Sequence, residues 1–288
     1  MAPSEFWPTS LVDEVANRRA VFVLGAGASV ESVGIGGARP PAWEALISEL
    51  GNKLSDQNDR NLVQSMIQAQ QYLDAAQIIR DQIPTADFSN IVRQQLDTPN
   101  FQASEIHKIV YAIDPKIVIT TNYDRIYEKY CDASSDHGTG YNVCKYYETH
   151  ALNDLRSNVR SILKIHGCVS NPTKIVLDRN SYFSARRDYP QFFRILDGIF
   201  LTSTLVFVGC SLVDPDLQLL LENANIAAPC DHSHFALMKA GQHPSKLRSV
   251  SKNFNIYALE YADPSHLEAV KQLKVLRDLV FERRSTSY

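Results

Sequence analysis

The chain has 288 residues, enough to bury the core of one large α/β domain or of two smaller ones. Its content of 44% hydrophobic and 21% charged residues is ordinary for a soluble globular protein. The formal net charge of -3 gives no general attraction to nucleic acid or to an anionic membrane, so we expect no direct nucleic acid binding.

Cysteine spacing and apolar runs bear on metals and membranes. The five cysteines include no Cys-x-x-Cys pair of the kind that structural zinc sites use, so we expect reduced thiols and no zinc. His232 and His234 alternate at the start of a predicted strand, which leaves a metal there conceivable. No apolar run approaches the roughly 20 residues that span a bilayer, and the N-terminus lacks the basic and apolar regions of an export signal. We therefore expect a cytoplasmic protein without a membrane segment.

In chain order, the first predicted elements are a helix from Ser10 to about Arg19 and a strand over residues 21–24. The strand breaks into a glycine loop, and the long glycine-rich segment that follows is typical of a flexible cover over a ligand. The helical patterns that come next lie near 42–54, 61–83, 87–96 and 103–113. We interpret residues of about 44–113 as a helical insertion after the first strand.

From residue 116 onward, strands and helices alternate. The predicted strands cover 116–121, 142–147, 161–165, 204–208, 234–238 and 256–260. The predicted helices cover 124–131, 189–203, 215–227 and 264–282. This order predicts an α/β fold, Rossmann-like, with a mostly parallel sheet and helices on both of its faces, in a single domain of residues 1–288.

Small or polar residues follow four of these strands. In the loop after the first strand, Gly25, Ala26, Gly27 and Ser29 would let backbone N–H groups approach a pyrophosphate, although a tight structural turn also explains them. Gly209 and Ser211 end another strand in the same way, with an ordinary turn as the alternative.

Two further strand ends carry groups suited to catalysis. Thr121 ends an apolar strand, and Asn122 and Asp124 follow it, where an α/β sheet binds its ligand, but Asn122 or Asp124 could instead cap the next helix. His166 ends the strand before Gly167 and would suit proton removal from a ribose hydroxyl or a water, although a structural role is also open.

The four motifs, in this order and each after a strand, resemble the sirtuin family over roughly residues 20–260. The resemblance implies an NAD site. It implies that the glycine loop holds the pyrophosphate and that Asn122 and Asp124 hold the nicotinamide ribose and carboxamide. It also implies that His166 is the base and that Gly209 and Ser211 contact the adenosine part of NAD. Two features depart from sirtuin deacylases, because the zinc-binding cysteine pairs are missing and residues 36–43 replace an Ile-Pro-Asp-Phe-Arg segment.

With Pro41-Ala-Trp43 near the glycine loop, this pattern resembles the divergent sirtuin-like NAD hydrolases of bacterial anti-phage defence. That likeness implies cleavage of the nicotinamide–ribose bond to give nicotinamide and ADP-ribose, with Trp43 among the NAD-binding residues. It also implies gating by homo-oligomerisation or by a separately encoded partner, such as a HerA-type ATPase or an Argonaute-like protein. The alternatives are an NAD-dependent protein deacylase and a non-catalytic scaffold that binds NAD or ADP-ribose.

Overall fold

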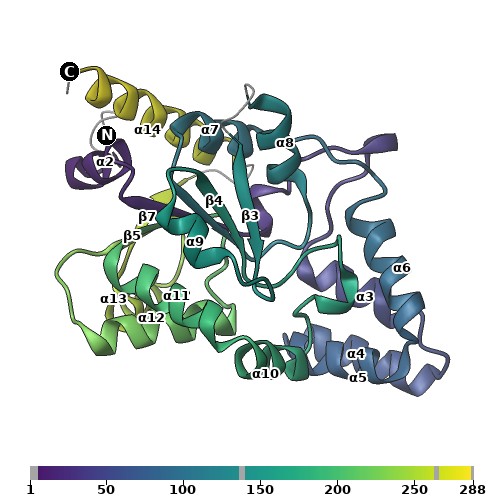
Figure 1. Ribbon diagram of the computed structural model, residues 1–288. Helices are drawn as coiled ribbons and strands as arrows, with labels where there is room; N and C mark the ends of the chain where they lie inside the picture. Colours follow the sequence, from purple (N-terminus) through teal and green to yellow (C-terminus); the bar gives the residue numbers. More distant parts are fainter. Residues whose placement is uncertain (1–5, 136–139, 263–265, 287–288) are drawn as a thin grey trace.

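A parallel sheet forms the centre of the protein (Figure 1). The computed structural model describes residues 6–135, 140–262 and 266–286. The strands of these residues are β1 (Ala20–Leu24), β2 (Ile117–Thr120), β3 (Tyr141–Lys145), β4 (Arg160–Lys164), β5 (Thr204–Val208), β6 (His234–Lys239) and β7 (Ile256–Tyr261). Within the described residues they pair in the order β3-β4-β2-β1-β5-β6-β7, and every pairing is parallel. The predicted α/β fold is confirmed.

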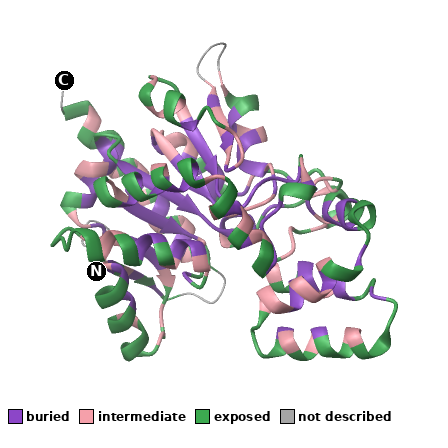
Figure 2. Cartoon of the chain, turned by 60° about the horizontal axis from the view of Figure 1, so that its bottom comes forward, coloured by how far each residue is buried: buried purple, intermediate pink, exposed green. Residues whose placement is uncertain are grey.

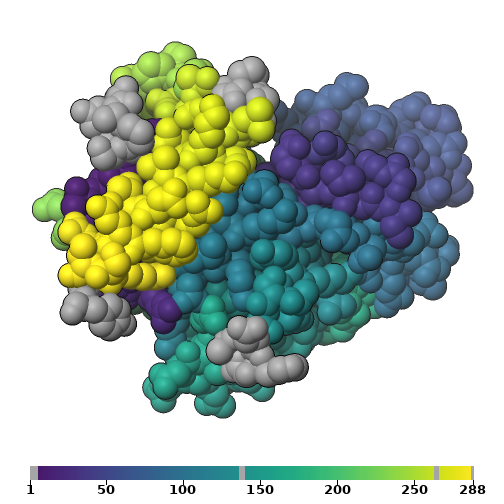
Figure 3. All heavy atoms as spheres, turned by 90° about the horizontal axis from the view of Figure 1, so that it is seen from above, coloured from purple at the N-terminus to yellow at the C-terminus, as the bar shows by residue number. Residues whose placement is uncertain are grey.

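Helices cover both faces of the sheet, as predicted. One face carries α2 (Thr9–Ala16), α7 (Glu105–Ile113), α8 (Ile126–Ser134) and α14 (Leu267–Thr286). The other carries α9 (Ala151–Arg156), α10 (Arg179–Asp188), α11 (Pro190–Thr202), α12 (Pro215–Ala227) and α13 (Pro244–Phe254). Seen from above, α14 lies across the outside of the first layer, where it packs against α2 and α7 (Figure 3).

The burial of β1 on both sides explains its unbroken apolar sequence. Phe22 faces the core beneath α2, α7 and α14, while Val21 and Val23 face the core beneath α11 and α12. All five residues of the strand are buried, which is the usual state of a central strand in a parallel sheet. Figure 2 shows the buried strands running through the larger part of the molecule.

A separate group of helices lies at one side of the sheet (Figures 1 and 2). It consists of α3 (Trp43–Gly51), α4 (Gln57–Gln68), α5 (Tyr72–Gln82) and α6 (Thr85–Leu96). These helices share a core of their own with Cys168, Val169, Ile175 and Leu177, which follow β4. The next helix, α7, packs on the sheet instead. The segment between β1 and β2 therefore divides into a side module and one helix of the sheet layer.

The helices differ from the predicted set in four places. The single helix predicted over 61–83 is wrong, because α4 ends near Gln70, whose φ of 59° breaks the helical backbone before α5. Three further helices, α9, α10 and α13, were not predicted from the sequence. Of the ten residues of α10, only Tyr182 and Ala185 are buried, so its apolar periodicity is weak. The start predicted for the last helix, residue 264, lies outside the described residues.

Candidate functional site

The strand order brings the four polar strand ends together. In the sheet, β4, β2, β1 and β5 are consecutive neighbours, and their carboxyl ends point to the same edge. The chain leaves β1 to one side for β2 and returns to the other side for β5, which is the topological switch point where open α/β sheets bind ligands. A cavity of about 530 Å³ lies there. Its lining includes every residue predicted for the site, namely Gly25, Ala26, Gly27, Ser29, Trp43, Thr121, Asn122, Asp124, His166, Gly209 and Ser211.

Close contact between the loops after β1 and β5 requires glycine. A Cβ atom on Gly25 would lie 2.5 Å from the carbonyl oxygen of Gly209, and one on Gly27 would lie 2.8 Å from the Cα of Gly209. Gly209 itself has a φ of 67° and no room for a side chain. The glycines therefore set the distance between the two loops that form the floor of the cavity.

Few amides of the glycine loop remain for a ligand. The N–H groups of Gly25 and Gly27 donate to the carbonyls of Val208 and Gly209, and that of Ser29 donates to Ala26. The N–H groups of Ala26 and Ser211 make no hydrogen bond with the described residues. An anion in the cavity would therefore find donors at Ala26 and in the segment after β5.

Asn122 is held in place by its side-chain amide. Its Nδ2 donates to the carbonyl of Gly25 at 3.0 Å and to Ser29 Oγ at 3.2 Å, while its backbone N–H donates to Thr120 Oγ1. Its Oδ1 accepts no hydrogen bond from the described residues. The carboxamide is thus fixed through its nitrogen, and its oxygen is left as an acceptor for a water or a hydroxyl group.

Asp124 connects the glycine loop to α8. Its Oδ2 accepts from Ser29 Oγ at 3.1 Å, and its Oδ1 accepts from the N–H of Ile126 at 2.9 Å. The second bond satisfies the first amide of α8, in keeping with the structural alternative considered for this residue, although the N-cap residue itself is Arg125. Asp124 is only 6% exposed. One carboxylate therefore both accepts the first amide of a helix and orients Ser29.

A buried ion pair supports Asp124 from below. Lys164, at the end of β4, is fully buried, and its Nζ lies 2.5 Å from Glu128 Oε1 and donates to the backbone carbonyl of Asp124 at 2.6 Å. Burial is the largest influence and disfavours the charge of Lys164, but Glu128, Cys168 and Asp124 together outweigh it, and the pKa of the lysine is raised above its ordinary 10.5. Lys164 therefore remains a cation beneath the site.

His166 faces two carboxylates that follow β5. Its Nε2 lies 3.6 Å from Asp214 Oδ2 and 3.3 Å from Asp216 Oδ2. Burial disfavours the imidazolium, but Asp214 and Asp216 outweigh it, so the pKa of His166 is raised above 6.5. Its Nδ1 makes no hydrogen bond with the described residues.

Hydrogen bonds fix the groups around this histidine. Tyr182 packs edge-on against His166 at 5.1 Å between ring centres and donates its hydroxyl to Asp214 Oδ2 at 2.8 Å. Asp214 also accepts from the N–H of Leu217 and so caps α12. Asp216 accepts from Arg186 Nε at 2.5 Å. The two carboxylates are therefore held in fixed positions on one side of the imidazole.

The side module supplies one wall of the cavity. Trp43, at the start of α3, packs against Tyr72 with 5.5 Å between ring centres, and both line the cavity. The indole Nε1 of Trp43 is buried and has no hydrogen-bond partner among the described residues. Such a donor is available to a ligand that reaches this wall.

Comparison with known proteins identifies the fold family. The profile of the SIR2-like domain family matches residues 116–259, which is half of the chain. The chain belongs to the SIR2-like domain family. The matched region contains the strand ends of Asn122, His166 and Ser211, and the resemblance to sirtuins is confirmed.

The SIR2-like chain is also similar to proteins of known name. It is 26% identical over 219 residues to defense-associated sirtuin 2 of Bacillus subtilis, covering 73% of this chain and 20% of that protein. It is 28% identical over 241 residues to NAD(+) hydrolase ThsA of Bacillus cereus (strain MSX-D12), covering 82% of this chain and 46% of the relative. A ThsA of Enterococcus faecium is 29% identical over 141 residues, 48% of this chain and 28% of its own. The SIR2-like chain thus spans less than half the length of these relatives.

Part of the site of this SIR2-like chain was not predicted from its sequence. The residues not predicted are Lys164, Tyr182, Asp214 and Asp216. Of these, Tyr182 and Asp214 line the cavity. The sequence does contain a signal for Asp214. An aspartate followed by proline at the start of a predicted helix is typical of a helix cap, and this helix follows β5 at the sheet edge where the site lies. Among the described residues, no cluster of three metal-ligating side chains lies in the cavity.

Proposed function

We propose that this chain hydrolyses NAD, cleaving the bond between nicotinamide and ribose to give nicotinamide and ADP-ribose. The observation that carries the proposal is the convergence of Asn122, His166 and the glycine loop on one cavity at the switch point of the sheet. The names of the relatives, which include NAD(+) hydrolases and a defense-associated sirtuin, support the same reaction. We further propose that it serves anti-phage defence by depleting NAD.

The loops of the cavity floor would bind the dinucleotide. Gly25, Gly27 and Gly209 let the two loops pack closely as a floor beneath a pyrophosphate, and the N–H groups of Ala26 and Ser211 would donate to it. Trp43 would close the cavity from the module side. Asp124 would act mainly by orienting Ser29, and the two side chains together would contact the nicotinamide carboxamide.

The reaction needs a positioned water and an acceptor for its proton. The leaving nicotinamide takes the electrons of the bond to ribose, and water forms the new bond to the same carbon. Asn122 would hold the water or a ribose hydroxyl through Oδ1, because Nδ2 is occupied. With its Nε2 turned to Asp214 and Asp216, His166 would accept the proton at Nδ1.

The test is nicotinamide release from NAD by the wild type, Asn122→Ala and His166→Ala, at several protein concentrations and with cell lysate added as a source of activator. Each variant should lose about a hundredfold or more in rate, as for other positioned catalytic groups. Circular dichroism and thermal melting would show that both stay folded. Release that persists in both variants would overturn the assignment of the site.

Rival functions give different results in this assay. A deacylase would require acyl-lysine peptide for ADP-ribose transfer, whereas the hydrolase releases nicotinamide equally well without it. A scaffold would bind NAD without turnover even when lysate is present. A rate per protein molecule that rises with protein concentration would support gating by a homo-oligomer. A rate that requires lysate would support a separately encoded partner, for which we propose a HerA-type ATPase or an Argonaute-like protein.

The exposed surface of the side module bears on whether it forms an oligomer interface. Among the described residues of α3 to α6, Leu62 is the one large apolar side chain that is exposed, at 46%, so these helices present no apolar stripe for assembly. The described helices also include none that is long and apolar enough to cross a bilayer. The side module therefore fits the role of a cavity wall better than that of an oligomer interface.

A further inference from the structure

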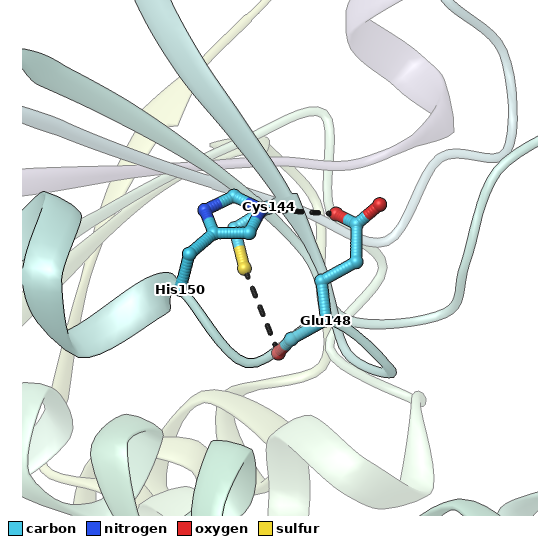
Figure 4. Close-up of side chains that lie close together, drawn as sticks. All are labelled: Cys144, Glu148 and His150. Atoms are coloured by element: carbon cyan, nitrogen blue, oxygen red, sulfur yellow. Dashed lines mark hydrogen bonds and ion pairs between the residues drawn. The ribbon is translucent and has the colours of Figure 1, made fainter.

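Three side chains with metal-binding atoms meet beyond the end of β3, away from the cavity. Cys144 lies in β3, Glu148 in the turn that follows, and His150 directly before α9. One donor atom from each lies within 4.8 Å of the other two. Figure 4 shows the three side chains facing one another. None of them lines the NAD cavity, so the cluster is independent of the proposed hydrolysis.

A second set of contacts orients the histidine. Asp154 Oδ2 lies 2.5 Å from His150 Nδ1, and Asn142 Nδ2 donates to the other carboxylate oxygen of Asp154 at 3.0 Å. This leaves His150 Nε2 directed at Glu148 Oε2, 3.4 Å away. A carboxylate on the far nitrogen is the usual support of a metal-bound histidine, because it fixes the tautomer and the ring orientation.

We propose that Cys144, Glu148 and His150 bind one Zn²⁺ ion. Thiolate, imidazole and carboxylate are the three protein ligands that zinc accepts, and softer or harder cations would favour only part of the set. The thiolate and the carboxylate together balance the charge of the ion. His150 is exposed and Cys144 is buried, so the ion would enter from the His150 side and keep a water as its fourth ligand.

Coordination replaces weaker contacts that now hold these groups. The thiol of Cys144 lies 3.6 Å and 3.9 Å from the backbone carbonyls of Lys145 and Glu148, and its proton would leave to solvent as the zinc–sulfur bond forms. Lys145 Nζ pairs with Glu148 Oε1 at 2.9 Å, and Oε2 accepts the backbone N–H of Lys145 at 2.9 Å. A carboxylate oxygen has two lone pairs, so the ion would take the second one of Oε2. The ion would tie the edge strand β3 to the start of α9. The expectation of no zinc rested on Cys-x-x-Cys spacing, which this cluster does not use.

The test measures metal binding by the full chain after chelator treatment, with Zn²⁺ alone and with Co²⁺ as a spectroscopic probe. We expect one Zn²⁺ per chain after dialysis, a melting temperature that rises with free Zn²⁺, and a cobalt–thiolate absorption band. Cys144→Ser should abolish the band, and His150→Ala and Glu148→Gln, which alter residues outside the core, should each weaken Zn²⁺ binding about tenfold or more.

The matched control is the double variant Cys230→Ser/His232→Ala. These residues form another closely spaced cysteine–histidine pair, and the N–H of His232 lies 3.4 Å from Cys230 Sγ. Zinc binding should be unchanged in the control. The proposal is overturned if the wild type retains no metal, if the His150 and Glu148 variants retain as much as the wild type, or if only the control loses it.

Discussion

Gly27 donates its backbone N–H to the carbonyl oxygen of Gly209 at 2.9 Å, so the loops after β1 and β5 are in direct backbone contact. A Cβ atom on Gly209 would lie 2.2 Å from the backbone nitrogen of Ala28. We therefore expect Gly209→Ala to lower the free energy of unfolding by about 2 kcal/mol or more, through the clash and the left-handed backbone. Denaturant titration would measure the loss, and calorimetry would show weakened NAD binding.

Gly198→Ala is the matched control for this substitution. Gly198 lies within α11, and a Cβ atom there would meet nothing within 4 Å. Alanine at this position should raise the free energy of unfolding by about 0.5–1 kcal/mol, because glycine loses more backbone entropy in a helix. Equal losses in both variants would argue against the contact between the two loops.

The pH dependence of hydrolysis should follow His166. A base must be unprotonated, so kcat/KM should fall as the pH drops through the pKa of this histidine. Because Asp214 and Asp216 raise that pKa, the midpoint of the acid limb should lie above 6.5. Asp214→Asn removes a negative charge but keeps a side chain that can cap α12, so it should move the midpoint to lower pH.

The control for the shifted profile is Asp188→Asn, which removes an exposed aspartate from the end of α10. Its midpoint should match that of the wild type. If the Asp214 and Asp188 variants give the same profile, His166 is not the group that sets the acid limb.

The strand ends were predictable because burial on both faces makes the strands of a parallel sheet continuous apolar runs, so that polar residues mark their ends. Asn122 and His166 were found in this way. Their proximity depends on the strand order, in which β4, β2, β1 and β5 are neighbours although more than eighty residues separate the ends of β1 and β2. Hydrophobic periodicity carries no information on that order.

Two parts of the site could not be predicted for the same reason. Lys164 interrupts an apolar strand and has the pattern of an exposed position. Its burial depends on Glu128 of α8 and on the carbonyl of Asp124, both distant in the sequence. Asp214 and Asp216 have the pattern of an ordinary helix start, and their proximity to His166 appears only when β5 takes its place three strands from β4.

The buried ion pair of Lys164 and Glu128 gives a test of stability. Lys164→Met leaves Glu128 as an uncompensated buried charge and should lower the free energy of unfolding by about 3–5 kcal/mol. Adding Glu128→Gln removes the stranded charge and should restore most of the loss. The double variant still lacks the hydrogen bond to the carbonyl of Asp124, so about 1 kcal/mol should remain missing.

A surface pair supplies the comparison for that experiment. Lys108 pairs with Glu105 at 2.8 Å, and both side chains are about half exposed. Lys108→Met should cost less than about 1 kcal/mol, since exposed ion pairs contribute little. Denaturant unfolding measures all four proteins. A double variant no more stable than Lys164→Met would show that the pair is not the reason for the loss.

His107 should make the protein less stable in mild acid. It is buried at the third residue of α7, where it completes the capping box with Ser104 and accepts from the N–H of that serine, and its pKa is lowered to about 4, mainly by burial. The unfolded chain takes up this proton near pH 6.5 and the folded chain only near pH 4, so stability is lost as the pH falls between those values. The two pKa values correspond to at most about 3 kcal/mol.

His107→Gln isolates this contribution, because glutamine is a preferred residue at that position of a capping box and does not titrate. Between pH 6.5 and 4 the free energy of unfolding of the variant should fall less steeply than that of the wild type. His234, whose pKa is also lowered to about 4 by burial, titrates in both proteins and cancels in the difference. Parallel stability curves for the two proteins would mean that His107 does not stay neutral in the folded chain. The start of α7 would then be held against the glycine loop by the hydrogen bond from Ser104 Oγ to the carbonyl of Ala28, with no contribution from a neutral His107.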